Sequence, residues 1–144
     1  VNARECRHWR TVTSCTQPHF VATLVRLADE HDTLRFVADQ RGCPTCVEDL
    51  APAALAALRS GATGLLHLTN AGETTWHGLA TAALAEAGLD AEVIPISTDE
   101  FPTAAKRPAY SVLGSERREG LGVEPLPDWR DTLTTIVAGL RSRS

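Results

Sequence analysis

The sequence predicts an α/β fold, and two observations support that prediction. Short apolar runs bounded by glycine, proline and polar residues alternate with longer segments of helical periodicity. Only three runs are predicted as strands, which is few for a complete doubly wound sheet, so we expect the carboxyl half of one. The 144 residues suffice for one domain, and 43% hydrophobic with 22% charged residues is ordinary for a globular protein.

Charge and hydropathy exclude several classes of partner. The net charge of −4 and the even spread of Lys and Arg argue against binding nucleic acid or an anionic membrane surface. No apolar run approaches the roughly 18 residues that a membrane span needs. The first residues are also too polar for a signal peptide. We therefore expect a cytoplasmic location, where the four cysteines are thiols rather than disulfides.

The first part of the chain leads from an irregular segment into a helix and a strand. Residues 1–18 lack helical or strand periodicity, so we separate them from a domain over 19–144. A helix is predicted over 19–32, because one apolar face is formed by Phe20, Leu24, Leu27 and Ala28. The run 34–38 is predicted as a strand. A helix over 50–60 is predicted to be capped by Asp49, with Pro52 in its first turn, where a missing N–H costs least.

The second part continues the alternation. The apolar run 64–68 is predicted as a buried strand, and 69–72 as a turn. A helix over 75–88 is expected to begin at Thr74 or Thr75 and to end at Gly88. The strand 92–96 contains a proline, which favours an edge position. Residues 101–113 are predicted to be largely irregular. A final helix runs from about 128 to 140, with an apolar face of Leu133, Ile136, Val137 and Leu140.

The stretch 38–50 is the centre of this organisation. A strand ends, a loop presents Asp39, Gln40 and Arg41, and Gly42 and Pro44 interrupt regular structure. Thr45 and Glu48 have the spacing of a helix capping box. In open α/β sheets, ligands bind at such carboxyl ends of strands, so this loop is the first candidate for a binding site.

Four motifs resemble one enzyme family when taken together. They are Asp-Gln-x-Gly-x-Pro-Thr at 39–45, Leu-His-Leu-Thr-Asn-x-Gly-x-x-Thr-Trp at 66–76, Glu-Phe-Pro-Thr-x-Ala-x-Arg-Pro-x-x-Ser-x-Leu at 100–113 and Pro-x-Trp-x-x-x-Leu at 127–133. Their order and spacing are similar to those of the dTDP-4-dehydrorhamnose reductases (RmlD-like), which are extended short-chain dehydrogenases of the sugar-nucleotide group. The resemblance covers residues 20 to about 140, and it implies the carboxyl-terminal, substrate-binding portion of a Rossmann-like fold.

The resemblance implies an activity for the full-length family. Its members reduce the 4-keto group of dTDP-6-deoxy-L-lyxo-4-hexulose with NADPH, giving dTDP-L-rhamnose for polysaccharide, and some bacterial members dimerise with Mg²⁺. Two features of that chemistry are missing from this sequence: a glycine-rich dinucleotide-binding turn and the catalytic Tyr-x-x-x-Lys. Tyr110 is the only tyrosine, and the residue four places on is Gly114. We therefore expect no cofactor binding and no reductase activity from this chain alone.

Five residues are predicted to bind the substrate, a dTDP-sugar nucleotide. Arg107 lies in a loop that Pro102 and Pro108 stiffen, and its guanidinium can form two hydrogen bonds to a diphosphate. The alternative is that Arg107 forms an ion pair with Asp39 or Glu100. Gln40, Pro44 and Thr45 belong to the first motif. The polar groups of Gln40 and Thr45 bond a sugar or ribose, or they close the turn on themselves. Trp76 offers a stacking surface for the nucleoside, although a tryptophan in the first turn of a helix more often packs in the core.

Cys43 and Cys46 form a Cys-x-x-Cys motif, which suggests two other functions. At a helix start this motif is typical of thioredoxin-like redox sites, and it is half of a zinc site, with Cys6, His8 or Cys15 as partners. Because the family resemblance already accounts for Gly-x-Pro-Thr here, we expect neither. Replacing both cysteines by serine is expected to leave the melting temperature nearly unchanged.

Two further hypotheses concern the chain as a whole. We expect the segment 1–18 to arise from translation that starts at an internal codon or in a shifted reading frame, which would make the chain a fragment of the enzyme. The alternative is that the chain is a non-catalytic binding module of the same family. Without the strands of an amino-terminal half, an open sheet edge would expose apolar side chains and favour a homodimer. The side chains concerned are those of Leu34, Phe36, Leu65, Leu66 and Leu68.

Overall fold

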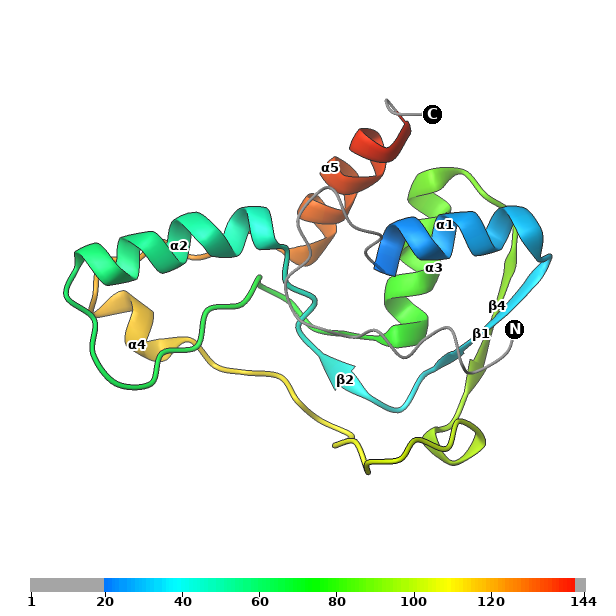
Figure 1. The fold of residues 1–144 in the computed structure, drawn as a ribbon, viewed down its shortest axis with the longest axis horizontal. Coiled ribbons are helices and arrows are strands. Elements are labelled where there is room, and N and C mark those ends of the chain that lie inside the picture. The colour runs from blue at the N-terminus through cyan, green and yellow to red at the C-terminus, as the bar shows by residue number, and fades with distance from the viewer. Residues whose placement is uncertain (1–19, 142–144) are drawn as a thin grey trace.

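The computed structural model describes residues 20–141, and it confirms the α/β alternation (Figure 1). The segment 1–18 lies outside the described residues. In chain order the elements are α1 (Phe20–Glu30), β1 (Thr33–Val37), β2 (Arg41–Gly42), α2 (Val47–Arg59), β3 (Thr74–Thr75), α3 (Trp76–Ala87), β4 (Glu92–Ile96), the 3-10 helix η2 (Thr98–Glu100), α4 (Glu116–Glu119) and α5 (Trp129–Arg141). No described helix is both long and apolar enough to cross a membrane.

A parallel pair of strands and three helices form the core. β1 pairs with β4 in the register Leu34↔Val93 and Val37↔Ile96. Figure 1 shows α1 and α3 beside this pair, with α5 on the far side of α3. α3 is the central helix, because Ala80 and Ala83 are fully buried and their small side chains allow its neighbours to approach. The buried cluster is completed by residues such as Leu24, Leu34, Leu84, Leu133 and Val137.

Two of the residues expected at an open apolar edge are in fact covered. Leu34 is only 2% exposed, and the ring of Phe36 lies edge-on to Phe20 of α1 at 5.6 Å between centroids. The expectation of exposure was wrong for both, because α1 and α3 cover this face of β1. It is correct for Leu65, which is 74% exposed. Within 20–141, β4 pairs with β1 alone, in agreement with the edge position predicted from Pro95.

The run 64–68 is not a strand, and this prediction was wrong. No described strand lies beside it, so its backbone groups cannot form a ladder. Instead the guanidinium of Arg117 donates through Nη1 to the carbonyl of Leu65 and through Nη2 to that of Thr63 at 2.9 Å. An arginine from α4 therefore satisfies carbonyls that a neighbouring strand would satisfy in a sheet.

Helix α2 begins earlier than predicted and without the predicted cap. Its N-cap is Cys46, which has extended backbone angles and makes no side-chain cap bond. Thr45 donates its hydroxyl to the carbonyl of Cys43, so the capping box of Thr45 and Glu48 is not formed. Pro52 consequently lies in the second turn, inside the helix, where it has no N–H to donate to the carbonyl four residues earlier. This helix extends away from the core, and Leu58 is 71% exposed.

Candidate functional site

The carboxyl ends of β1 and β4 meet at one edge of the sheet, because the two strands are parallel. Asp39 follows β1 and Thr98 follows β4. The Asp39 carboxylate accepts from the Thr98 amide at 2.9 Å and from the Thr98 hydroxyl at 2.6 Å, and these bonds lower the pKa of Asp39. Gln40 donates to the same hydroxyl at 3.0 Å. The predicted sugar ligand Gln40 thus belongs to a network that joins the two strand ends.

The loop 101–115 is attached to the loop that follows β1. The amide of Arg41 donates to the carbonyl of Ala109 at 2.8 Å, and the amide of Ser111 donates to the carbonyl of Arg41 at 2.9 Å. β2 also pairs antiparallel with β3, in the register Arg41↔Thr75. The first three sequence motifs therefore come together around Arg41, although they are far apart along the chain.

An ion pair and a hydrogen bond strengthen this junction. Nε and Nη2 of Arg41 lie 2.8 and 2.7 Å from Oε1 of Glu73, and the Tyr110 hydroxyl donates to Oε2 of Glu73 at 3.0 Å. The bond from Arg41, followed by that from Tyr110, lowers the pKa of Glu73. In turn, the bond to Glu73 raises the pKa of Tyr110, so this phenol retains its proton. No sequence pattern indicates that Glu73 and Tyr110 meet.

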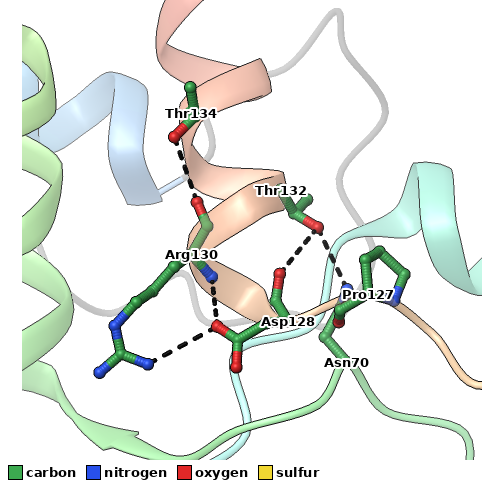
Figure 2. Close-up of polar contacts among 6 residues, drawn as sticks. All are labelled: Asn70, Pro127, Asp128, Arg130, Thr132 and Thr134. Atoms are coloured by element: carbon green, nitrogen blue, oxygen red, sulfur yellow. Dashed lines mark hydrogen bonds and ion pairs between the residues drawn. The ribbon is translucent and has the colours of Figure 1, made fainter.

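Asn70 connects the starts of α2 and α5, and the residue is only 2% exposed. Figure 2 shows it beside Pro127 and Thr132 at the start of α5. Its side-chain oxygen accepts from the amide of Cys46, the N-cap of α2, at 2.9 Å. Its Nδ2 lies within hydrogen-bond distance of Oδ2 of Asp49 at 2.7 Å, the carbonyl of Pro127 at 3.0 Å and Oγ1 of Thr132 at 3.2 Å. Asn70 thus satisfies the amide of the N-cap residue of α2 and fixes that helix against the start of α5.

A pocket of about 350 Å³ lies beside this junction. It combines polar and apolar walls from the first, second and third motifs and from the segment leading to α5. The lining residues are Cys43, Thr69, Asn70, Ala71, Gly72, Glu73, Val112, Leu113, Ser115, Arg118, Pro125 and Leu126. None of the five predicted site residues lines it.

The predicted site residues are distributed over several elements outside the lining of this pocket. Arg107 is exposed and makes no ion pair with any residue of 20–141; of its two suggested partners, Asp39 bonds Thr98 and Glu100 bonds Arg35 and Ser97. Pro44 and Thr45 precede α2, and the hydroxyl of Thr45 faces the backbone of Cys43 and Asn70. The ring of Trp76 packs against the core, 5.8 Å from that of Phe20. Whether these residues bind substrate stays a prediction.

The arrangement of Cys46 is unlike that of a reactive thiol. Its Sγ lies 2.6 Å from Oε2 of Glu48, and burial together with this carboxylate raises its pKa to about 11. A redox-active thiol needs the opposite shift. The part of the chain that the structure describes contains no group of three or more possible metal ligands; Cys6, His8 and Cys15 lie outside it.

We expect Cys46 to resist alkylation in the folded chain. With its pKa raised from 9.0 to about 11, the thiolate fraction at pH 8 falls about a hundredfold. Iodoacetamide labelling followed by peptide mass spectrometry should show this slowing, with the same residue in the urea-unfolded chain as the control. Equal rates in the two states would contradict the raised pKa.

Acid should weaken the junction around Glu73. Because the folded pKa of Glu73 is lowered, its stabilising contribution is present above the unfolded pKa of about 4.3 and is lost as pH falls through the folded value. The melting temperature of the variant E73Q should therefore fall less between pH 5 and pH 3 than that of the wild type. The control is E86Q, since Glu86 is exposed and has no ion pair with a described residue; an E73Q profile parallel to the wild type would refute the prediction.

Comparison with known proteins gives a consistent result. The RmlD substrate binding domain family matches residues 9–142, a range that starts inside the segment 1–18. A dTDP-4-dehydrorhamnose reductase of Streptomyces griseus is 41% identical over 133 residues, which cover 88% of this chain and 44% of that protein. The spore coat polysaccharide biosynthesis protein SpsK of Bacillus subtilis is 39% identical over 115 residues, which cover 80% of this chain and 40% of that protein. The chain thus spans less than half the length of these curated relatives.

Solved structures agree in fold. A dTDP-4-dehydrorhamnose reductase of Clostridium acetobutylicum superposes with a TM-score of 0.83 at 34% identity, covering 88% of this chain and 45% of that one. The dTDP-4-dehydrorhamnose reductase of Bacillus anthracis in complex with NADP superposes with a TM-score of 0.81 at 30% identity, covering 90% of this chain and 44% of that one. The matched portion confirms a partial fold of the extended short-chain dehydrogenase type, and the chain belongs to the RmlD substrate binding domain family.

Proposed function

We propose that this chain binds a dTDP-sugar nucleotide, as the substrate-binding part of a dTDP-4-dehydrorhamnose reductase. The observation that carries the proposal is the convergence of three sequence motifs at Arg41, where the Ala109 and Ser111 backbone and the Glu73 carboxylate meet. A site assembled from distant segments can contact several parts of one ligand at once. The similarity to reductases of this name supports the choice of ligand.

In this proposal the role of the chain is to bind and orient. Arg107 offers an exposed guanidinium, without an ion pair among residues 20–141, to the diphosphate. Gln40 follows β1 and Thr45 precedes α2, and we assign their polar groups to the sugar; Trp76 is the first residue of α3. The junction of Arg41, Glu73 and Tyr110 fixes the loop that carries Arg107.

NADPH, which the family uses, does not fit the described part of this chain. Its residues include no glycine-rich turn between a strand and a helix; the turn after β1, residues 38–40, holds no glycine and leads into β2. Tyr110 donates to Glu73 and has no lysine four residues on. We therefore assign no hydride or proton transfer to these residues, and we propose that reduction needs groups beyond them.

Thermal denaturation with separate ligands tests the proposal. A dTDP-sugar should raise the melting temperature, since a ligand at a hundred times its Kd stabilises by about 2.7 kcal/mol, whereas NADPH should not. R107Q should lose most of the dTDP-sugar effect, and R26Q, which alters an exposed arginine on α1, should keep it. No response of the wild type to dTDP-sugar would refute the proposal, as would an unchanged response of R107Q.

Assembly is a separate proposal. We propose that a homodimer would cover the edge of the strand pair that no strand of residues 20–141 covers, and Mg²⁺ is implied by the family resemblance alone. Light scattering with and without Mg²⁺ measures both effects. A monomer at all concentrations, unfolding in one cooperative step, would show that the chain does not need a second copy.

A further inference from the structure

The segment 102–111, which carries Arg107, is held to the body of the chain at one place. It contains neither a helix nor a strand, and its residues are exposed. In the part of the chain that the structure describes, every hydrogen bond from this segment to another one ends at Arg41 or Glu73. The backbone of Arg41 makes three of these bonds, and the carboxylate of Glu73 accepts the fourth, from Tyr110. The place of Arg107 therefore depends on this attachment.

Glu73 completes the attachment, because its two carboxylate oxygens bind different segments. Oε1 lies 2.8 Å from Nε and 2.7 Å from Nη2 of Arg41, at the start of β2, and Oε2 accepts from the Tyr110 hydroxyl at 3.0 Å. The side chains of Arg41 and Glu73 are 49% and 36% exposed, so the ion pair contributes little to the free energy of unfolding. We therefore expect the carboxylate to affect the position of the segment more than the stability of the fold.

We propose that Glu73 is a positioning residue of the dTDP-sugar site, which holds the segment 102–111 so that Arg107 keeps one place. Arg107 lies three residues before Tyr110, and Pro108 between them limits the backbone angles of the connection. A guanidinium that is held in place before the ligand arrives loses less conformational entropy on binding. The inference rests on the proposed function, and it gives Glu73 no contact with the ligand.

A double-mutant cycle, measured by calorimetric titration with dTDP-L-rhamnose, tests this role. E73Q keeps the shape of the side chain, but its amide nitrogen cannot accept a hydrogen bond, so one of the two attachments is lost. E73Q should bind roughly tenfold more weakly than the wild type, whereas adding E73Q to R107Q should change the affinity by less than about twofold. The matched control E86Q, on the exposed side of α3, should bind like the wild type.

Trypsin digestion without ligand gives a second, independent measurement. The bond between Lys106 and Arg107 is cut only when this segment leaves its attachment and fits the protease. Arg59, exposed at the end of α2, supplies a reference cut in the same molecule. The ratio of the first cut to the second should rise severalfold in E73Q, whereas a uniform loss of stability would leave that ratio unchanged. If E73Q does not fold, Y110F removes the same hydrogen bond from the other side and should raise the same ratio.

The outcomes distinguish the role of Glu73 from the proposed function. Wild-type affinity in E73Q, an equal effect of E73Q with and without R107Q, or an unchanged cleavage ratio would each overturn the role of Glu73 and leave the dTDP-sugar proposal intact. A wild type that does not bind dTDP-L-rhamnose would refute the proposed function, and this role with it. If R107Q binds too weakly for the cycle, the affinity of E73Q and the cleavage ratio decide.

Discussion

Replacing Asn70 by alanine is expected to lower the free energy of unfolding by about 3 kcal/mol or more. The substitution leaves the amide of Cys46, the carboxylate of Asp49 and the carbonyl of Pro127 without the partner that Asn70 provides. Each buried polar group left unsatisfied costs about 1–3 kcal/mol, and the Asp49 group is charged. Thr132 still bonds Asp49 at 2.7 Å, which limits the loss at that carboxylate.

Urea unfolding followed by circular dichroism measures the effect of Asn70→Ala. The control is Gln40→Ala, which removes a side-chain amide whose one hydrogen bond to Thr98 is partly exposed, and which should cost about 1 kcal/mol or less. The contribution of Asn70 to the contact between α2 and α5 would be refuted if both variants lost the same stability.

Replacing Gly72 by alanine is the second large effect that we expect, a loss of about 2–4 kcal/mol. Gly72 has a φ of +80°, in the left-handed region that favours glycine. A Cβ atom there would lie 2.6 Å from Oδ2 of Asp128 and 2.9 Å from Cδ1 of Trp129. Because Trp129 is only 4% exposed, its ring cannot move away without disturbing the start of α5.

Gly61→Ala separates the two contributions. Gly61 has a φ of +74°, but a Cβ there would meet no heavy atom within 4 Å. That variant should show the backbone cost alone, about 1–2 kcal/mol. Thermal denaturation of both variants gives the difference, and a Gly72→Ala variant as stable as Gly61→Ala would mean that the start of α5 shifts to accommodate the added methyl group.

Local pattern was sufficient to predict that α1, α2, α3 and α5 and the strands β1 and β4 exist, but it did not predict β2, β3 or α4. The apolar face of α1 and the caps of α3, Thr75 and Gly88, depend on residues within a few positions of one another, and the structure agrees with each. The start of α2 could not be predicted in this way. The amide of its N-cap residue donates to Asn70, which lies 24 residues further along the chain, so no local pattern indicates this contact.

In the candidate site, too, features that depend on nearby residues were predicted and contacts between distant segments were not. Family motifs located the loops at 39–45 and 100–113, because short sequence signatures identify a family without any knowledge of contacts. They did not identify the ion pair between Arg41 and Glu73 or the hydrogen bond from Tyr110 to Glu73. Those depend on which distant segments meet, and a single sequence does not contain that information. The strand predicted at 64–68 failed for a related reason: an apolar run becomes a strand only where a neighbour supplies backbone partners.

The pairing of β1 with β4 has a consequence for the order of folding. The two strands are separated along the chain by residues 38–91, so joining them requires closure of a long loop. Loop closure costs conformational entropy before any contact compensates for it. By contrast, α3 and β4 are near neighbours in sequence, as are α1 and β1. In stopped-flow experiments, truncations in α3 should therefore slow refolding, whereas truncating Ile96, a partner of Val37 in the ladder, should mainly accelerate unfolding.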